Sequence, residues 1–196
     1  MKLVLASKNN KKLVEMQEIL SALGVEVVLQ AEVGVDVDVE ETGTTFAENA
    51  ALKARAVCEA SGLPAIADDS GLCVDALNGA PGVYSARYGG EGLSDTERWQ
   101  LLLNAMRGQL DRRCGFVSAI CCAFPNGDEL TAMGECRGTL AYAAKGDNGF
   151  GYDPIFFVPE KKKTFAELTA EEKHEISHRG KALREFKEKL ETYLAK

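Results

Sequence analysis

Residues 2–29 read KLVLASKNNKKLVEMQEILSALGVEVVL, and this stretch decides the fold class. The run KLVLA at 2–6 is largely apolar and predicts a buried strand, and VEVVL at 25–29 predicts a second strand. Between them, apolar residues recur at helical spacing from Leu13 to Leu23. A strand, a helix and another strand in this order indicate a parallel unit, and therefore an α/β protein.

The chain beyond this unit predicts further elements of both kinds. A helix is expected from Thr45, where Thr45-Phe46-Ala47-Glu48 fits a capping box, through the alanine-rich AENAALKARAVCEA. Valines alternate with acids over residues 33–41, which favours a strand. PAIA at 64–67 predicts a short buried strand that ends at Asp68, where α/β sites gather.

The second half predicts a hairpin and a final helix. Strands over 114–124 and 129–136 flank the turn Asn126-Gly127. The final helix carries an apolar stripe made of Leu183, Phe186, Leu190 and Leu194. Parallel-type units followed by a hairpin indicate a mixed sheet flanked by helices.

Length and charge limit the possible functions. At roughly 150 residues per domain, 196 residues allow one domain or two closely packed lobes. The net charge of −7 argues against a general nucleic-acid binder. Any anion site must therefore be a compact local cluster of cations.

Membrane and secretory signals are not found in this sequence. The longest uncharged stretch, Cys114 to Gly127, is too short to span a bilayer, and Lys11 and Lys12 interrupt any apolar core of a signal peptide. We therefore expect no membrane partner and a cytoplasmic location. The six cysteines show no CxxC pair and are expected to be buried reduced thiols, with Cys121 and Cys122 facing opposite sides of a strand.

The loop at residues 7–12 is a candidate phosphate site. It follows the first strand and opens the first helix, so backbone N–H groups and Lys12 could converge on a phosphate. For this loop alone, an Asn-capped helix with solvated lysines is the simpler alternative. The chain has no GxxxxGK[ST], and GFGYDP lacks the third glycine of a dinucleotide fingerprint, which excludes P-loop and Rossmann cofactor sites.

Acidic residues form two further candidate groups. Asp68 and Asp69 follow a buried strand, where a charged carboxylate is costly unless a bound group such as a divalent metal compensates its charge. The alternative is a turn in which both carboxylates are solvated. For most members of the second group, Asp36, Asp38, Glu40 and Glu41, a charged sheet edge is the simpler interpretation. Asp36-Val37-Asp38 echoes the DxDx[TV] signature of aspartyl-phosphate phosphatases, but Glu40 at the fifth position excludes it.

A third group is rich in hydrogen-bond donors: Lys173, His174, Ser177, His178 and Arg179. Lys173 and Arg179 suit the keto edge of a purine, because both offer only hydrogens. Phe150 and Tyr152, between glycines, could offer a stacking face. The alternatives are a charged helix start and ordinary core aromatics.

Taken together, these pieces resemble the inosine/xanthosine triphosphate pyrophosphatase family. Five ordered motifs carry the resemblance: SxNxxK at 7–12, TFAENAxLKA at 45–54, ADDSGLxVDALxGAPGVYSARY at 67–88, GFGYDPIF at 149–156 and ELTxEEKxxISHRGxAL at 167–183. Two departures are mild: Asn148 precedes Gly149 where another glycine is common, and Lys8-Asn9-Asn10 replaces a more glycine-rich loop. They concern loop geometry rather than the reaction.

The resemblance implies a house-cleaning hydrolase of deaminated purine nucleoside triphosphates. ITP, dITP and XTP would give the monophosphate and pyrophosphate, with Mg2+ as cofactor. The implied fold is one domain over residues 1–196, an elongated mixed sheet flanked by helices with a central cleft between two lobes, and members are usually homodimers. The alternative is a purine nucleotide-binding sensor without hydrolysis; the paired acids at 68–69 favour the hydrolase, because a pure binder gains nothing from acids beside phosphate.

The resemblance also implies a role for each matched residue. The triphosphate would be held by Ser7, Lys8, Asn9, Asn10, Lys11, Lys12 and Lys53. Glu40 and Asp69 would serve the metal, and Asp69 would act as the general base. The nucleotide site would be lined by Ser70, Phe150, Gly151, Tyr152, Asp153, Lys173, His178 and Arg179. Whether Asp68 or Glu41 also serves the metal stays open.

Overall fold

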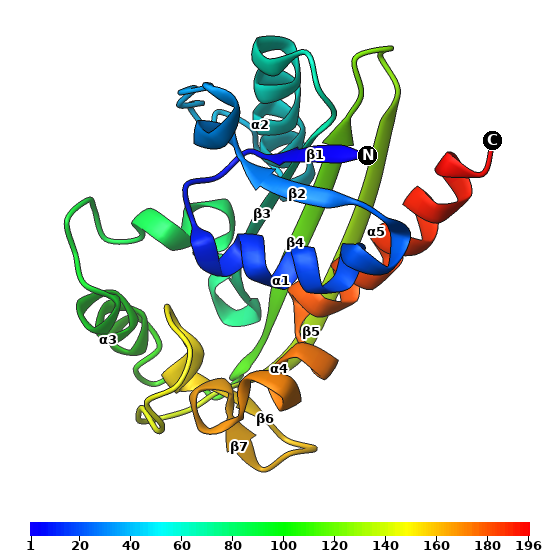
Figure 1. The fold of residues 1–196 in the computed structure, drawn as a ribbon. Coiled ribbons are helices and arrows are strands. Elements are labelled where there is room, and N and C mark those ends of the chain that lie inside the picture. The colour runs from blue at the N-terminus through cyan, green and yellow to red at the C-terminus, as the bar shows by residue number, and fades with distance from the viewer. The chain divides into compact units, whose positions relative to one another are not determined.

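The computed structural model describes residues 1–196 and contains a mixed seven-stranded sheet flanked by helices (Figure 1). The strand order is β2-β1-β3-β4-β5-β6-β7. The strands are β1 (Lys2–Leu5), β2 (Glu26–Leu29), β3 (Ala65–Val74), β4 (Arg113–Ala123), β5 (Glu129–Leu140), β6 (Phe156–Val158) and β7 (Lys163–Thr164). Strand β1 pairs in parallel with β2 and β3, whereas β6 pairs antiparallel with β5 and β7. The predicted mixed α/β sheet is confirmed.

The α-helices begin at residues that satisfy their free N–H groups. They are α1 (Asn10–Leu20), α2 (Phe46–Ser61), α3 (Asp95–Ala105), α4 (Ala170–Ile176) and α5 (His178–Leu194). Side chains of Asn9, Thr45, Ser94 and Thr169 cap the first four. None of the helices combines the length and the apolar character that a membrane crossing requires.

The chain forms two compact units. Unit 1 comprises Met1–Asp69, Ser118–Gly134 and Lys181–Lys196, and unit 2 comprises Ser70–Val117 and Glu135–Gly180. Each unit therefore collects segments that are far apart in the sequence.

The core of unit 1 has two layers, which follow from the alternation of side chains along β1. Leu3 and Leu5 are fully buried in a cluster with apolar residues of α1 and α5, whereas Val4 belongs to a cluster with α2. The adjacent cysteines of β4 confirm the same alternation, because Cys122 lies in the first cluster and Cys121 in the second. All six cysteines are free, as predicted, and five of them are buried; Cys73 is half-buried, so the prediction of burial was wrong for this residue.

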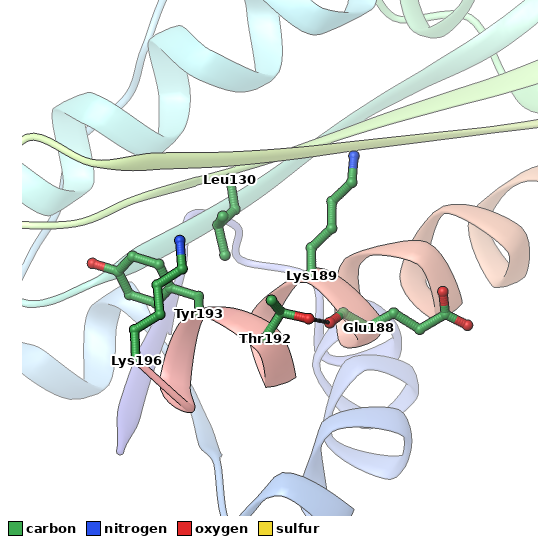
Figure 2. A pocket seen from close by; sticks show the side chains of 6 residues that line it. All are labelled: Leu130, Glu188, Lys189, Thr192, Tyr193 and Lys196. Carbon is green, nitrogen blue, oxygen red and sulfur yellow. Dashed lines mark hydrogen bonds between the residues drawn. The ribbon is translucent and has the colours of Figure 1, made fainter.

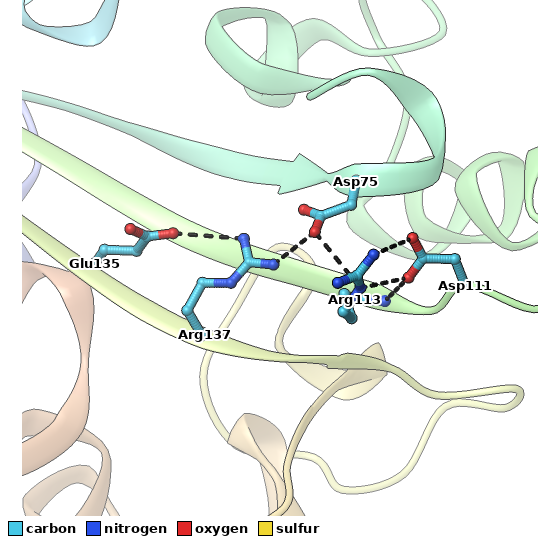
Figure 3. A network of polar contacts seen from close by, with 5 residues as sticks. All are labelled: Asp75, Asp111, Arg113, Glu135 and Arg137. Carbon is cyan, nitrogen blue, oxygen red and sulfur yellow. Dashed lines mark hydrogen bonds and ion pairs between the residues drawn. The ribbon is translucent and has the colours of Figure 1, made fainter.

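The core of unit 2 is built on aromatic rings. The Phe116 and Phe156 rings have centroids 4.6 Å apart, and Phe165 stacks on Phe116 at 5.5 Å. On the surface of the same unit, two arginines of β4 and β5 bind three acids (Figure 3), namely Asp75, Asp111 and Glu135. Exposed ion pairs contribute about 0–1 kcal/mol each, so we attribute the stability of this unit mainly to the aromatic cluster.

Four local predictions were wrong in detail. Strand β3 does not end at Asp68 but continues to Val74. Residues 34–41 form no strand. The carboxylate of Glu48 accepts at 2.6 Å from the N–H of Thr44, one residue before the N-cap position that a capping box uses. Leu194 lies at the end of α5 and is 44% exposed, so it does not extend the buried stripe.

Candidate functional site

In unit 1, the loop after β1 is closed by its own side chains. Asn9 caps α1, since its Oδ1 accepts from the N–H groups of Lys11 and Lys12 at 2.9 and 3.4 Å. Ser7 Oγ accepts from the N–H of Asn9 at 3.0 Å. Lys8, Asn10 and Lys11 are exposed, whereas Lys12 is half-buried. The two first-turn N–H groups that a phosphate could use are therefore bound by Asn9 in this form.

Lys12 points at the predicted acids. Its Nζ lies 2.8 Å from Oδ1 of Asp68, a side chain that is 2% exposed. Asp68 lies on β3 just beyond Ile66, which forms the last residue pair between the two strands with Leu5 of β1. The aspartates thus lie within a strand, yet at the carboxyl end of its parallel neighbour, which is where ligands of α/β sheets bind.

Lys53 of α2 is the second cation of this group. Its Nζ donates to the main-chain oxygen of Asp68 at 2.7 Å. The same nitrogen lies 3.5 Å from Glu41 Oε1 and 3.8 Å from Asp69 Oδ1. One buried ammonium therefore holds together the loop before α2 and the two aspartates of β3.

Asp69 is a buried carboxyl with a strongly raised pKa. It is 8% exposed, and its Oδ2 is buried without a hydrogen-bond partner. Burial raises the pKa of Asp69 to about 6, and the charge of Lys53 opposes that rise. Such an oxygen can accept a proton or face a cation, so Asp69 is chemically suited to both predicted roles.

The fit of a divalent metal rests on few ligands. No three His, Cys, Asp or Glu residues form a ready metal cluster. Asp69 offers its unpartnered Oδ2, and Glu41 lies on the other side of Lys53. The predicted Glu40 is exposed, and no contact joins it to this group. These donors fit Mg2+, which is commonly held by one or two carboxylates together with phosphate oxygens and water.

In unit 2, the buried carboxylate of Asp153 organises a second group. Its Oδ2 accepts from the N–H of Phe150 at 3.0 Å and from Lys173 Nζ at 2.6 Å. Burial raises the pKa of Asp153, and the charge of Lys173 opposes this. The loop of GFGYDP and the end of α4 are joined at this point.

Phe150 is presented to solvent beneath two cations. Its ring is 50% exposed, Lys173 Nζ lies 4.8 Å from the ring centroid, and Arg179 Cζ lies 5.9 Å from it. An exposed aromatic ring can stack on the base of a ligand, and a purine would provide a matching face. The structure therefore brings together the predicted stacking residue and the predicted donors.

Three other predicted residues of unit 2 are placed differently. Tyr152 is buried and donates its hydroxyl to the main-chain oxygen of Ser85 at 2.6 Å, so the prediction of a stacking face on Tyr152 was wrong. The ring of His178 is buried and stacks on Phe116 at 4.8 Å. Ser70 is half-buried beside Asp69 in β3.

The sequence reasoning missed residues that support these groups. Asn49 of α2 is fully buried and accepts from the N–H of Gly43 at 2.8 Å, and its Nδ2 is a second buried polar atom without a hydrogen-bond partner. It was visible within TFAENA as a polar residue on the alanine-rich face. Asp95, which contacts Gly151, gave no signal beyond its place after a helix cap.

A hollow of about 420 Å³ beside α5 in unit 1 is unrelated to these groups (Figure 2). Its lining residues are Leu130, Glu188, Lys189, Thr192, Tyr193 and Lys196. None of them is a predicted site residue, and Lys189 is tied to the main-chain oxygen of Thr131 at 2.7 Å. The hollow is therefore not part of the candidate site.

The chain is similar over nearly its whole length to known proteins. The model described as the Ham1 family matches residues 3–189. A dITP/XTP pyrophosphatase of Haemophilus influenzae is 52% identical, covering 96% of this chain and 98% of that protein. One of Synechocystis is 51% identical, covering 92% and 90%. Among solved structures, the Staphylococcus aureus Ham1 protein superposes with a TM-score of 0.93 at 44% identity, covering 98% of this chain and all of that one.

Proposed function

Because the chain belongs to the Ham1 family, we propose that it is a nucleoside triphosphate pyrophosphatase acting on ITP, dITP and XTP. The products would be the nucleoside monophosphate and pyrophosphate. The observation that carries the proposal is the buried Asp69 with its unpartnered oxygen, 3.8 Å from the ammonium of Lys53. A base and a cation side by side are what hydrolysis of a phosphoanhydride requires.

The residues of unit 1 would serve the phosphates. Asp69 would orient a water and take its proton while the water attacks the α-phosphorus. Lys12 and Lys53, which neutralise carboxylates in this form, would offset the charge that develops on the leaving pyrophosphate. Mg2+ bound by Asp69 with Glu40 or Glu41 would supply further positive charge at the phosphates.

The residues of unit 2 would serve the base. Phe150 would stack on the purine, and Lys173 and Arg179 would donate to its 6-keto oxygen. Adenine carries an amino donor at that position, so donor would face donor and ATP would be rejected.

Product analysis tests the reaction. Purified protein is incubated with ITP and Mg2+ in 18O-labelled water, and the products are identified by 31P NMR and mass spectrometry. We expect IMP and pyrophosphate in equal amounts, with the label in IMP, since the water attacks the α-phosphorus. Orthophosphate as the first product, or label in pyrophosphate, would contradict the proposal. Binding without turnover would support the alternative of a nucleotide sensor.

We further propose that residues 1–196 act as a single domain, as a homodimer in the cytoplasm, which the family resemblance implies. The six free cysteines fit a reducing compartment. Light scattering after gel filtration measures the assembly, and a monomer mass at micromolar concentration would reject the dimer.

A further inference from the structure

The backbone that carries the exposed ring of Phe150 is held by two carboxylates, which accept from the consecutive N–H groups of Phe150 and Gly151. Asp153 Oδ2 accepts from the N–H of Phe150 at 3.0 Å, and Asp95 Oδ2 accepts from the N–H of Gly151 at 2.8 Å. Asp153 belongs to the same loop, whereas Asp95 is the first residue of α3. The loop is thus fixed to a distant helix at the residue that follows the ring.

The loop needs such a contact because its glycine-rich backbone can adopt many conformations. Gly149 and Gly151, on either side of Phe150, have φ values of 74° and 59°. A hollow of about 420 Å³ lies between the start of α3 and residues 144–151, so packing alone does not support the loop on that side. A Cβ on Gly149 would collide with the carboxylate of Asp153, so the loop also requires glycine at this position.

Helix α3 is well placed to act as the fixed point. Ser94 and Glu97 form a complete capping box at its start, with Ser94 N donating to Glu97 Oε2 at 2.7 Å. The buried guanidinium of Arg98 donates to the main-chain oxygens of Tyr88, Gly90 and Leu93 at 2.8 to 3.1 Å. The first turn that carries Asp95 is therefore itself held on two sides.

We propose that Asp95 is a positioning residue for base recognition: its hydrogen bond to Gly151 fixes the Phe150 ring where a purine stacks. The inference rests on the proposed function, because it assumes that Phe150 receives the base. Asp95 does not touch the substrate and acts only through the loop. Stacking on a fixed ring stabilises the ground state and the transition state alike, so losing it should raise KM more than it lowers kcat.

The test compares three variants with ITP as substrate. Asp95→Ala removes the acceptor, and we expect KM to rise about tenfold with kcat changed by less than about twofold. Asp95→Asn keeps an acceptor oxygen and should restore KM to near the wild-type value. Glu97→Ala is the matched control, because it weakens the same helix start but does not contact the loop.

A double-mutant cycle shows whether Asp95 acts through Phe150. In a Phe150→Ala background, Asp95→Ala should have little further effect on KM, since the ring it positions is gone. Equal KM changes in Asp95→Ala and Glu97→Ala, or additive effects with Phe150→Ala, would overturn the inference. Failure of the wild-type protein to hydrolyse ITP would instead reject the proposed function, so the two failures are distinguishable.

Discussion

The ammonium of Lys12 lies 2.8 Å from Oδ1 of Asp68, so a cation at the start of α1 neutralises a buried acid on β3, 56 residues later in the chain. The acid is 2% exposed and the lysine 22% exposed, which makes this a largely desolvated pair. The first prediction concerns its contribution to stability.

Lys12→Gln should lower the free energy of unfolding by about 1–3 kcal/mol, because it leaves a buried carboxylate without its cation. Urea denaturation measures this. Lys8→Gln is the control: Lys8 pairs with Asp36 at 3.2 Å, but the two side chains are 68% and 88% exposed, so the change should be under about 0.5 kcal/mol. Equal losses in both variants would contradict the prediction.

Asp69→Asn should reduce kcat for ITP at least about a hundredfold, because the amide cannot accept the proton of the attacking water. Circular dichroism should show an intact fold. Asp36→Asn, which changes an exposed carboxylate in the same unit, should keep full activity. Near-normal turnover of Asp69→Asn at saturating Mg2+ would place the base elsewhere.

Removal of divalent metal should abolish turnover, because a chain of net charge −7 with clustered acids cannot accept a bare triphosphate. The measurement is pyrophosphate release after exhaustive chelation, followed by return of Mg2+. Full activity in the chelated protein would refute the proposal of a metal cofactor. Recovery with Mg2+ excludes damage by the chelator.

Arg179→Ala should shrink the ratio of kcat/KM between ITP and ATP, since in the proposed site the lost donor would contact the 6-keto oxygen, which hypoxanthine presents and adenine does not. Both efficiencies are measured in wild type and variant. Arg184→Ala, at an exposed position of the same helix α5, is the control and should leave the ratio unchanged. An unchanged ratio in Arg179→Ala would remove this residue from base recognition.

The cysteines should react slowly with a thiol reagent in the native protein. Burial raises the pKa of Cys114 to about 12 and that of Cys121 to about 11, so little thiolate exists at neutral pH. Half-buried Cys73, whose pKa burial also raises, should react before the others. Labelling should accelerate with rising pH and reach six thiols on denaturation. Rapid labelling of several thiols at pH 7 would contradict this.

Most of the fold could be predicted from local patterns. The spacing from Leu13 to Leu23, the helix start at Thr45 and the turn at Asn126-Gly127 are short-range signals, and the structure confirms each element. The end of β3 could not be predicted, because two aspartates within a strand are tolerated only when distant cations meet them, here Lys12 and Lys53. That pairing is not visible in the sequence.

The candidate site was predictable as residue types but not as contacts. The donor-only character of Lys173 indicated a purine edge, but its pairing with Asp153 at 2.6 Å depends on the path of the loop between them. The burial of Tyr152 could not be predicted, because exposed and buried side chains alternate in a glycine-rich loop without the regular period of a helix or strand. Glu41 rather than Glu40 lies near Lys53. Which of the two adjacent side chains points toward the lysine depends on the local backbone conformation.

The interleaved order of the two units also bears on how the nascent chain folds. The core of unit 1 needs Leu183, Phe186 and Leu190 of α5, all fully buried, yet residues 135–180 belong to unit 2 and emerge from the ribosome first. At a synthesis rate of about 5–20 residues per second, the apolar faces of β1 and β4 stay uncovered by that helix for at least several seconds. Chaperone demand during synthesis should therefore peak before residue 181 appears, and shortening the chain within α5 should cause aggregation rather than a milder loss of stability.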